Sequence, residues 1–255
     1  MQTNTPPRDH VLDSREALMT KGGTQDIDDF IYLISHDVRA SVRALLELPQ
    51  WISEDLEEAG VTVNGSVAQS IDLMNRHTGR LDRMLVDLLT YSRIGRMQAL
   101  RLVTLADALA EVCETMQLPG GFVLDHDIEA APFLIGDRDI LTLLTALLSN
   151  AVKHHDRMQG RIVVTAADAG EYVVLSVSDD GPGIDSKMHS RIFNAMTTLR
   201  PRDEVEGSGM GLAIVRKIAD FYGGDVRVGP SVYGRGCTIE VRLSRQTQLA
   251  GGLTQ

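Results

Sequence analysis

The decisive stretch of the chain reads Gly207-Ser208-Gly209-Met210-Gly211-Leu212, and an apolar pattern of helical period follows it directly. A second glycine-rich turn, Asp179-Asp180-Gly181-Pro182-Gly183, lies upstream. Glycine lets the backbone approach a phosphate closely, and a helix N-terminus adds unpaired amides with a positive partial charge. Either turn alone would be read as a surface loop. Together, and because the upstream turn carries a carboxylate, they predict opposite walls of one nucleotide pocket.

Composition narrows the classes of partner. The chain has 255 residues, 43% of them hydrophobic, and a net charge of -10. This acidity argues against nucleic acid and anionic membranes as partners, because both require a basic surface. No apolar run approaches the roughly 18 residues of a membrane span, and no signal peptide is evident, so we expect a cytoplasmic protein. Cys113 and Cys237 lie in apolar patterns and are expected to be buried thiols rather than metal ligands.

Two heptad patterns in the first hundred residues predict a helical hairpin with its turn at 59–65. Two helices cannot bury two apolar stripes well, whereas two hairpins can, so we expect a homodimeric four-helix bundle. Pro49 should kink the first helix. The first seam consists of Ile27, Ile31, Ile34, Val38, Ser41, Leu45, Leu48 and Ile52, and the second of Val67, Ile71, Met74, Thr78, Leu81, Leu85, Leu88 and Ser92.

His36 falls at heptad position f of the first helix, the most exposed position of a coiled coil. An ordinary surface histidine is one reading. However, Asp37 follows directly and can orient the ring or accept its proton, so an exposed imidazole beside a carboxylate also suits a nucleophile.

The remaining chain mixes helical and strand patterns. Helices are expected at 105–116 and 139–154, and strands at 161–167, 172–178, 225–229 and 237–243. Strands with helices on one face form an α+β layer. The junction between the two parts is expected near 95–100, and residues 1–24 and 246–255 are expected to be flexible tails.

Five motifs in a fixed order resemble those of two-component sensor histidine kinases. Phe30–Arg39 is similar to the H box, Leu147–Asp156 to the N box, and Arg191–Met196 to the F box. The two glycine-rich turns are similar to G1 and G2. The resemblance covers roughly residues 26–243 and implies a dimerisation and histidine-phosphotransfer hairpin (25–97). A catalytic ATP-binding domain (98–245) would follow, an α/β sandwich of the Bergerat (GHKL) type shared with gyrase and heat-shock chaperone ATPases.

The resemblance also implies roles for individual residues. His36 would attack the γ-phosphate of ATP, and Asp37 would deprotonate or orient its ring. Asn150 would coordinate Mg²⁺ with the phosphates, and Lys153, one turn on, would reach a phosphate. Asp179 would accept a hydrogen bond from the adenine amino group.

The glycines of the two turns would shape the pocket, with a mobile lid between them at about 186–206. Phe193 is expected at the base of the lid, although a plain core role fits nearly as well. Lid arginines could touch phosphates, and Arg39 could neutralise the phosphoryl group or form a surface salt bridge. Gly181 and Gly183 would form the adenine wall, and the phosphates would lie against Gly207, Gly209, Gly211 and Leu212.

The chain departs from the family pattern at three positions. Ser41 replaces a common proline, Ala146 replaces a common asparagine of the N box, and Ala40 replaces the Thr or Asn typical of members with phosphatase activity. We therefore expect weak phosphatase activity. The expected partners are a second copy of the chain, a response regulator, and a separate sensory protein, because the first 24 residues leave no room for a sensor domain. The alternatives are a phosphotransfer scaffold and a GHKL ATPase that is not a histidine kinase.

Overall fold

The computed structural model describes residues 10–96, 98–199 and 207–245; for residues 10–30 and 36 it describes the backbone alone. The chain forms two compact units, Met1–Arg93 and Ile94–Gln255. The first unit is helical, and the second combines helices with two sheets. No helix among the described residues has the length and apolar character needed to cross a bilayer.

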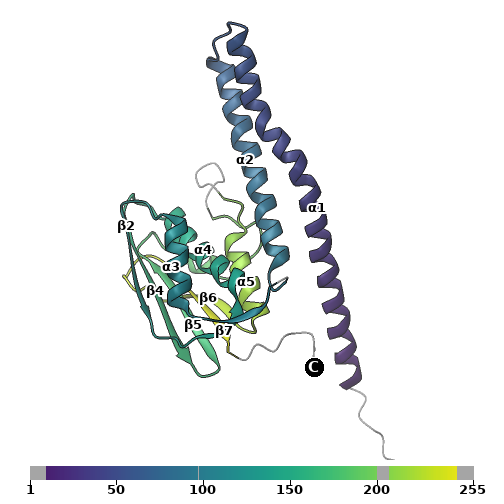
Figure 1. Cartoon of the computed structure of the whole chain (residues 1–255). Helices are drawn as coiled ribbons and strands as arrows, with labels where there is room; N and C mark the ends of the chain where they lie inside the picture. Colours follow the sequence, from purple (N-terminus) through teal and green to yellow (C-terminus); the bar gives the residue numbers. More distant parts are fainter. Residues whose placement is uncertain (1–9, 97, 200–206, 246–255) are drawn as a thin grey trace, which may run out of the picture. The chain divides into compact units, whose positions relative to one another are not determined.

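The first unit is a hairpin of two long helices, α1 (His10–Glu58) and α2 (Gly65–Arg93), which lie side by side in Figure 1. Among the contacts between them, Arg39 Nε lies 3.8 Å from Asp82 Oδ1, and the Arg93 guanidinium lies 5.2 Å from the centre of the Tyr32 ring. Of the two roles expected for Arg39, the structure therefore shows the salt bridge. Pro49 lies inside α1 without ending it.

The start of α1 corrects one expectation. Residues 1–24 were expected to form a tail, but α1 begins at His10. Extending an existing helix costs far less than nucleating one, so a long helix can propagate through Gly22 and Gly23 despite their low propensity, about 1 kcal/mol each. Residues 1–9 and the expected C-terminal tail lie outside the described residues.

One face of the hairpin is buried within the single chain and another is not. In α1 the buried positions are Ser35, Val42 and Pro49, a heptad apart. The seam predicted from the sequence lies beside them and remains between 38% and 45% exposed at Ile34, Val38, Leu45, Leu48 and Ile52. Exposed apolar residues continue on α2 at Val67, Met74 and Leu81. The hairpin therefore presents an apolar stripe that its own two helices do not cover.

The second unit is built on a five-stranded sheet of order β2-β4-β5-β7-β6. The first pair, β2 with β4, is parallel, and the other pairs are antiparallel. A smaller antiparallel sheet pairs β1 (Leu100–Val103) with β3 (Phe133–Gly136). The strands of the large sheet are β2 (Phe122–Ile128), β4 (Gly160–Ala169), β5 (Tyr172–Asp179), β6 (Asp225–Gly229) and β7 (Thr238–Ser244).

Three helices cover one face of this sheet: α3 (Leu105–Met116), α4 (Asp137–Lys153) and α5 (Gly211–Phe221) (Figure 1). The three inner strands, β4, β5 and β7, bury about every second side chain against them, as in a sheet with one packed face. The result is a two-layer α/β sandwich, as expected. Its core includes Leu143, Leu144, Leu147, Ile162, Val164, Val173, Leu175, Ile218, Val241 and Leu243.

A buried polar hub fixes the N-terminus of α4 and the C-terminus of α5. These ends are opposite to those that carry Asn150 and the second glycine-rich turn. The Tyr222 hydroxyl donates to Asp139 Oδ2 at 2.8 Å and accepts from the Gly136 N–H at 3.0 Å. The Gly95 N–H donates to the same oxygen of Asp139 at 2.9 Å. Burial, and then the neighbouring Asp139 carboxylate, raise the pKa of Tyr222 far above its ordinary value. The hub therefore joins the N-terminus of α4, the C-terminus of α5 and the start of this unit.

Candidate active site

Asp179 ends β5 and is held by two backbone donors. Its Oδ1 accepts the N–H of Gly181 at 2.9 Å and the N–H of Cys237 at 3.2 Å. Burial of the carboxylate raises its pKa, and the two N–H donors oppose that shift without cancelling it. Among the described residues no donor is found on Oδ2. Asp179 thus presents a fixed, partly desolvated acceptor, the kind of group that can receive a hydrogen bond from an amino group.

The glycines of this turn are required by close packing. Gly236 has φ +89°, and a Cβ there would lie 1.8 Å from the carbonyl oxygen of Asp179. Gly183 has φ +80°, and its Cβ would lie 3.0 Å from the carbonyl oxygen of Gly236. Only glycine meets both conditions at these positions. The turn after β5 and the loop before β7 therefore fit against each other through two glycines.

Two polar residues of α4 lie one turn apart. Asn150 is half-buried and Lys153 is exposed, whereas Leu147 and Ala151 face the core. Residues three apart share a helix face. The amide oxygen of Asn150 is a hard ligand, and Mg²⁺ in proteins is usually held by one or two side chains together with substrate phosphates. The described residues contain no cluster of three His, Cys, Asp or Glu that could hold a metal by itself.

The second glycine-rich turn leads into α5. Gly209 has φ +76°, and a Cβ there would lie 2.8 Å from the carbonyl oxygen of Thr197. The N–H of Met210 donates to the Ser208 hydroxyl at 3.0 Å. An added Cβ at Gly207 or Gly211 would meet no described atom within 4 Å. The unpaired amides at the start of α5, with open space beside them, suit an anion, and Leu212 lies in this first turn.

The segment between the two turns is only partly described. It contains a short 3₁₀ helix at Ser186–Met188 and then turns. Phe193 is buried, with 6% exposure, which fits both the role at the base of the lid and the plain core role. The two lid arginines, Arg200 and Arg202, lie outside the described residues.

His36 and Asp37 lie inside α1, and the backbone there is continuous helix. Ser35, next to His36, is buried, and Asp37 is exposed. The exposed position f expected for His36 stays a prediction. These two residues belong to the first unit, whereas the candidate nucleotide-site residues belong to the second.

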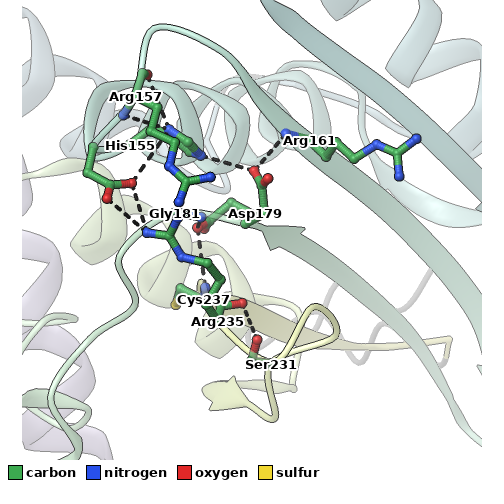
Figure 2. A network of polar contacts seen from close by, with 10 residues as sticks. His155, Arg157, Arg161, Asp179, Gly181, Ser231, Arg235 and Cys237 are labelled. Carbon is green, nitrogen blue, oxygen red and sulfur yellow. Dashed lines mark hydrogen bonds and ion pairs between the residues drawn. The ribbon is translucent and has the colours of Figure 1, made fainter.

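The structure also identifies residues that the sequence analysis did not single out. Directly after α4, His155 bonds to Asp180 and Asp156 bonds to Arg235. Figure 2 labels His155 and Arg235 in this network. These pairs join segments far apart in the chain, so no local pattern indicates them. Two adjacent histidines at 154–155 and the glycine pair at 234 and 236 were the available signals.

The two cysteines are both free thiols. Cys237 is buried as expected, and its burial together with the nearby Asp179 carboxylate raises its pKa to about 12. Cys113 is only half-buried, which corrects the expectation for that residue. It lies in α3, where Leu109 and Val112 take the core positions instead.

Comparison with known proteins places this site in a family. Residues 136–247 match the family of histidine kinase-, DNA gyrase B- and HSP90-like ATPases. The methanogenesis regulatory histidine kinase FilI of Methanothrix harundinacea is 28% identical over 221 residues, which are 84% of this chain and 24% of FilI. The sensor protein ChvG of Rhizobium meliloti is 30% identical over 221 residues, which are 79% of this chain and 37% of ChvG. The chain thus spans well under half the length of these relatives.

Solved structures share the fold. Full-length ShkA in complex with AMPPNP has a TM-score of 0.64 and 23% identity, over 87% of this chain and 47% of ShkA. The histidine kinase ThkA in complex with the response regulator protein TrrA has a TM-score of 0.59 and 18% identity, over 86% of this chain and 63% of ThkA. The helical region followed by an α/β sandwich is therefore the architecture of known histidine kinases.

Proposed function

Because the chain belongs to the sensor histidine kinases, we propose that it is an ATP-dependent protein histidine kinase that phosphorylates its own His36. The phosphoryl group then passes to an aspartate of a response regulator. The observation that carries this proposal is the carboxylate of Asp179, which is partly buried and fixed through Oδ1 by two backbone N–H groups. Such a preset acceptor suits the amino group of adenine.

Around this acceptor each motif has a proposed task. Asn150 would hold Mg²⁺ together with the phosphates, and the bound ion would supply positive charge that neutralises the charge developing on them. Lys153 and the amides at the start of α5, near Gly207, Gly209 and Gly211, bind the phosphates. Gly181 and Gly183 shape the adenine wall. Phosphoryl transfer needs positioning and charge neutralisation above all, and these groups supply both.

At the phosphorylation site the proposed step is an in-line displacement. The lone pair of one His36 ring nitrogen forms the new bond to the γ-phosphorus, the bond to the β–γ bridging oxygen breaks, and ADP leaves with that electron pair. Asp37 takes or holds the proton of the other ring nitrogen. The hairpin (25–97) is the proposed phosphotransfer domain and residues 98–245 the catalytic domain.

Three partners belong to this proposal. A second copy would cover the apolar stripe of the hairpin to form the four-helix bundle. A response regulator would accept the phosphoryl group; ThkA was solved with such a protein. Sensory input would come from a separate protein, and an unchanged rate of labelling in its presence would argue against a given candidate.

Labelling with γ-³²P-ATP tests the proposal. The wild-type chain should acquire label that is labile in acid and stable in base, the behaviour of phosphohistidine. His36→Gln should abolish labelling and leave the ATP dissociation constant unchanged, because the nucleotide site lies in the other unit. His77→Gln, in the second helix, is the matched control and should label normally. Acid-stable label would favour the alternative of a GHKL ATPase that is not a histidine kinase. Label that survives His36→Gln would show that the assignment of the phosphorylation site is wrong.

A further inference from the structure

We propose that His155 and Asp156 are positioning residues that together set the adenine-reading carboxylate of Asp179. They follow α4 directly, and they act through two other elements rather than on the nucleotide itself. The inference rests on the proposed function, since it concerns how the adenine acceptor is held. We call His155 and Asp156 together the α4 clamp.

The first arm of the clamp is a buried ring. The His155 side chain is fully buried, and its Nε2 lies 3.0 Å from Asp180 Oδ1. Nδ1 lies 3.1 Å from the backbone nitrogen of Arg157 and 3.2 Å from its carbonyl oxygen. We assign the tautomer in which Nδ1 accepts the N–H of Arg157 and Nε2 donates to Asp180, because the carboxylate can only accept. The N–H of Arg161 donates to the same carboxylate oxygen at 2.7 Å. Asp180 is thus fixed between the residue that follows α4 by two positions and the start of β4.

Electrostatics agree with this geometry. Desolvation would raise the pKa of Asp180, but the Arg161 N–H and the His155 ring outweigh it, and the pKa lies below its usual value. Asp180 is therefore an anion at neutral pH, and the His155 N–H is a donor to a charged acceptor. Hydrogen bonds of this kind are about twice as strong as neutral ones.

The ring also fits a space that two glycines create. A Cβ on Gly160 would lie 2.6 Å from His155 Nε2, and one on Gly181 would lie 3.3 Å from its Cδ2. Phe122 meets the ring edge-on, with the ring centres 5.2 Å apart. The imidazole is thus packed on β2, on β4 and on the turn that follows Asp179, so its position is coupled to that turn by shape as well as by hydrogen bonds.

The second arm is an ion pair between Asp156 and Arg235, which lies in the loop between β6 and β7. Nη2 of Arg235 lies 3.0 Å and 2.8 Å from the two carboxylate oxygens of Asp156. The hydrogen bond from Arg235 lowers the pKa of Asp156. The Ser231 hydroxyl donates to the carbonyl oxygen of Arg235 and closes the loop between β6 and β7 (Figure 2).

The two arms converge on Asp179. Asp180, which His155 holds, directly precedes Gly181, and Arg235, which Asp156 holds, lies two residues before Cys237. The N–H groups of Gly181 and Cys237 are the two donors on Asp179 Oδ1. The clamp therefore fixes both segments that orient the carboxylate.

A pair of nucleotides isolates this effect. Purine riboside 5′-triphosphate lacks the amino group of ATP but keeps its ring, ribose and phosphates. In the full chain with Mg²⁺, calorimetry should show wild type binding ATP more tightly than the analogue. For His155→Phe, which keeps an aromatic ring but has no donor, the ATP dissociation constant should rise about tenfold, the worth of one charge-assisted hydrogen bond. The constant for the analogue should stay within about twofold.

Companion variants keep the test decisive. His155→Gln retains an N–H donor and should recover most of the preference for ATP. Asp156→Asn changes an exposed residue, so it should fold and should also reduce the preference. Asp225→Asn removes a surface ion pair with Arg242 in the same unit and should change nothing.

Two failures can be told apart. An equal rise for both nucleotides, or an unchanged preference for ATP in His155→Phe and Asp156→Asn, would overturn the clamp while leaving the proposed function intact. A wild-type chain that binds no ATP, or shows no preference for the amino group, would instead overturn the proposed role of Asp179.

Discussion

The fold partly buries the carboxylate of Asp179 and so removes part of its hydration. The folded pKa is raised above the ordinary aspartate value, chiefly by desolvation. For such a group the native state binds the proton more tightly than the unfolded chain does. Stability is therefore lost as the pH rises through the interval between the ordinary and the raised pKa. The ionised carboxylate therefore destabilises the nucleotide-free domain. We propose that a hydrogen bond from the adenine amino group offsets this cost when ATP binds.

The variant Asp179→Asn should separate these two effects. Its side-chain oxygen can still accept the N–H groups of Gly181 and Cys237, while the buried charge is gone. We expect the melting temperature of the nucleotide-free chain at pH 7 to equal or exceed that of wild type. The ATP dissociation constant should rise about 10- to 100-fold, the worth of a hydrogen bond to a charged acceptor. A clear drop in the melting temperature of the empty chain would show that the charge itself holds the turn.

Single residues were predictable from sequence where the motif is local. The turn at Asp179–Gly183 is a local glycine-rich pattern, and the resemblance to the N box singled out Asn150 and Lys153. Their roles at a nucleotide site stay predictions. The α4 clamp and Gly236 were not predictable, because each depends on contacts between segments that meet only in the folded sheet. His155 follows α4 and Asp180 follows β5, and no periodic pattern contains such a pairing.

Among the elements, the sequence predicted those with a regular apolar pattern and missed those that are exposed or very short. The helix at 105–116 and the strand at 225–229 coincide with α3 and β6. The strand β2 was missed because it is an edge strand whose Asp125, His126 and Asp127 are all exposed. The strands β1 and β3 have four residues each, too few for alternation to register.

The polar hub gives a prediction for α4 and α5, the two helices that carry the proposed phosphate-binding residues. Tyr222→Phe removes the donor to Asp139, which is only 2% exposed, and the acceptor of the Gly136 N–H. Leaving buried polar groups short of partners costs about 1–3 kcal/mol, so the melting temperature should fall by several degrees. Tyr172→Phe, on β5, is the matched control. An unchanged melting temperature in Tyr222→Phe would mean that the hub adds nothing to stability.

For the whole molecule, the exposed stripe of the hairpin is the feature that most needs a partner. Apolar residues repeat along it at heptad spacing, which two hairpins can bury as one core. Leu45 is at an a position and is 44% exposed in the single chain. Monomeric proteins rarely leave such a continuous apolar surface uncovered, and a second copy of the same hairpin has the matching pattern.

The variant Leu45→Glu tests this assembly. Each dimer would have to bury two new charges in place of two leucines, a loss of about 2–5 kcal/mol per site. The two sites together cost at least about 4 kcal/mol, so the dimer dissociation constant should rise at least about a thousandfold. Sedimentation equilibrium should show a wild-type dimer and a monomeric variant. Arg43→Glu, at exposed position f of the same helix, should remain dimeric. If the wild-type chain sediments as a monomer at tens of micromolar, the proposed dimer is wrong. A partner other than a second copy would then have to cover the apolar stripe.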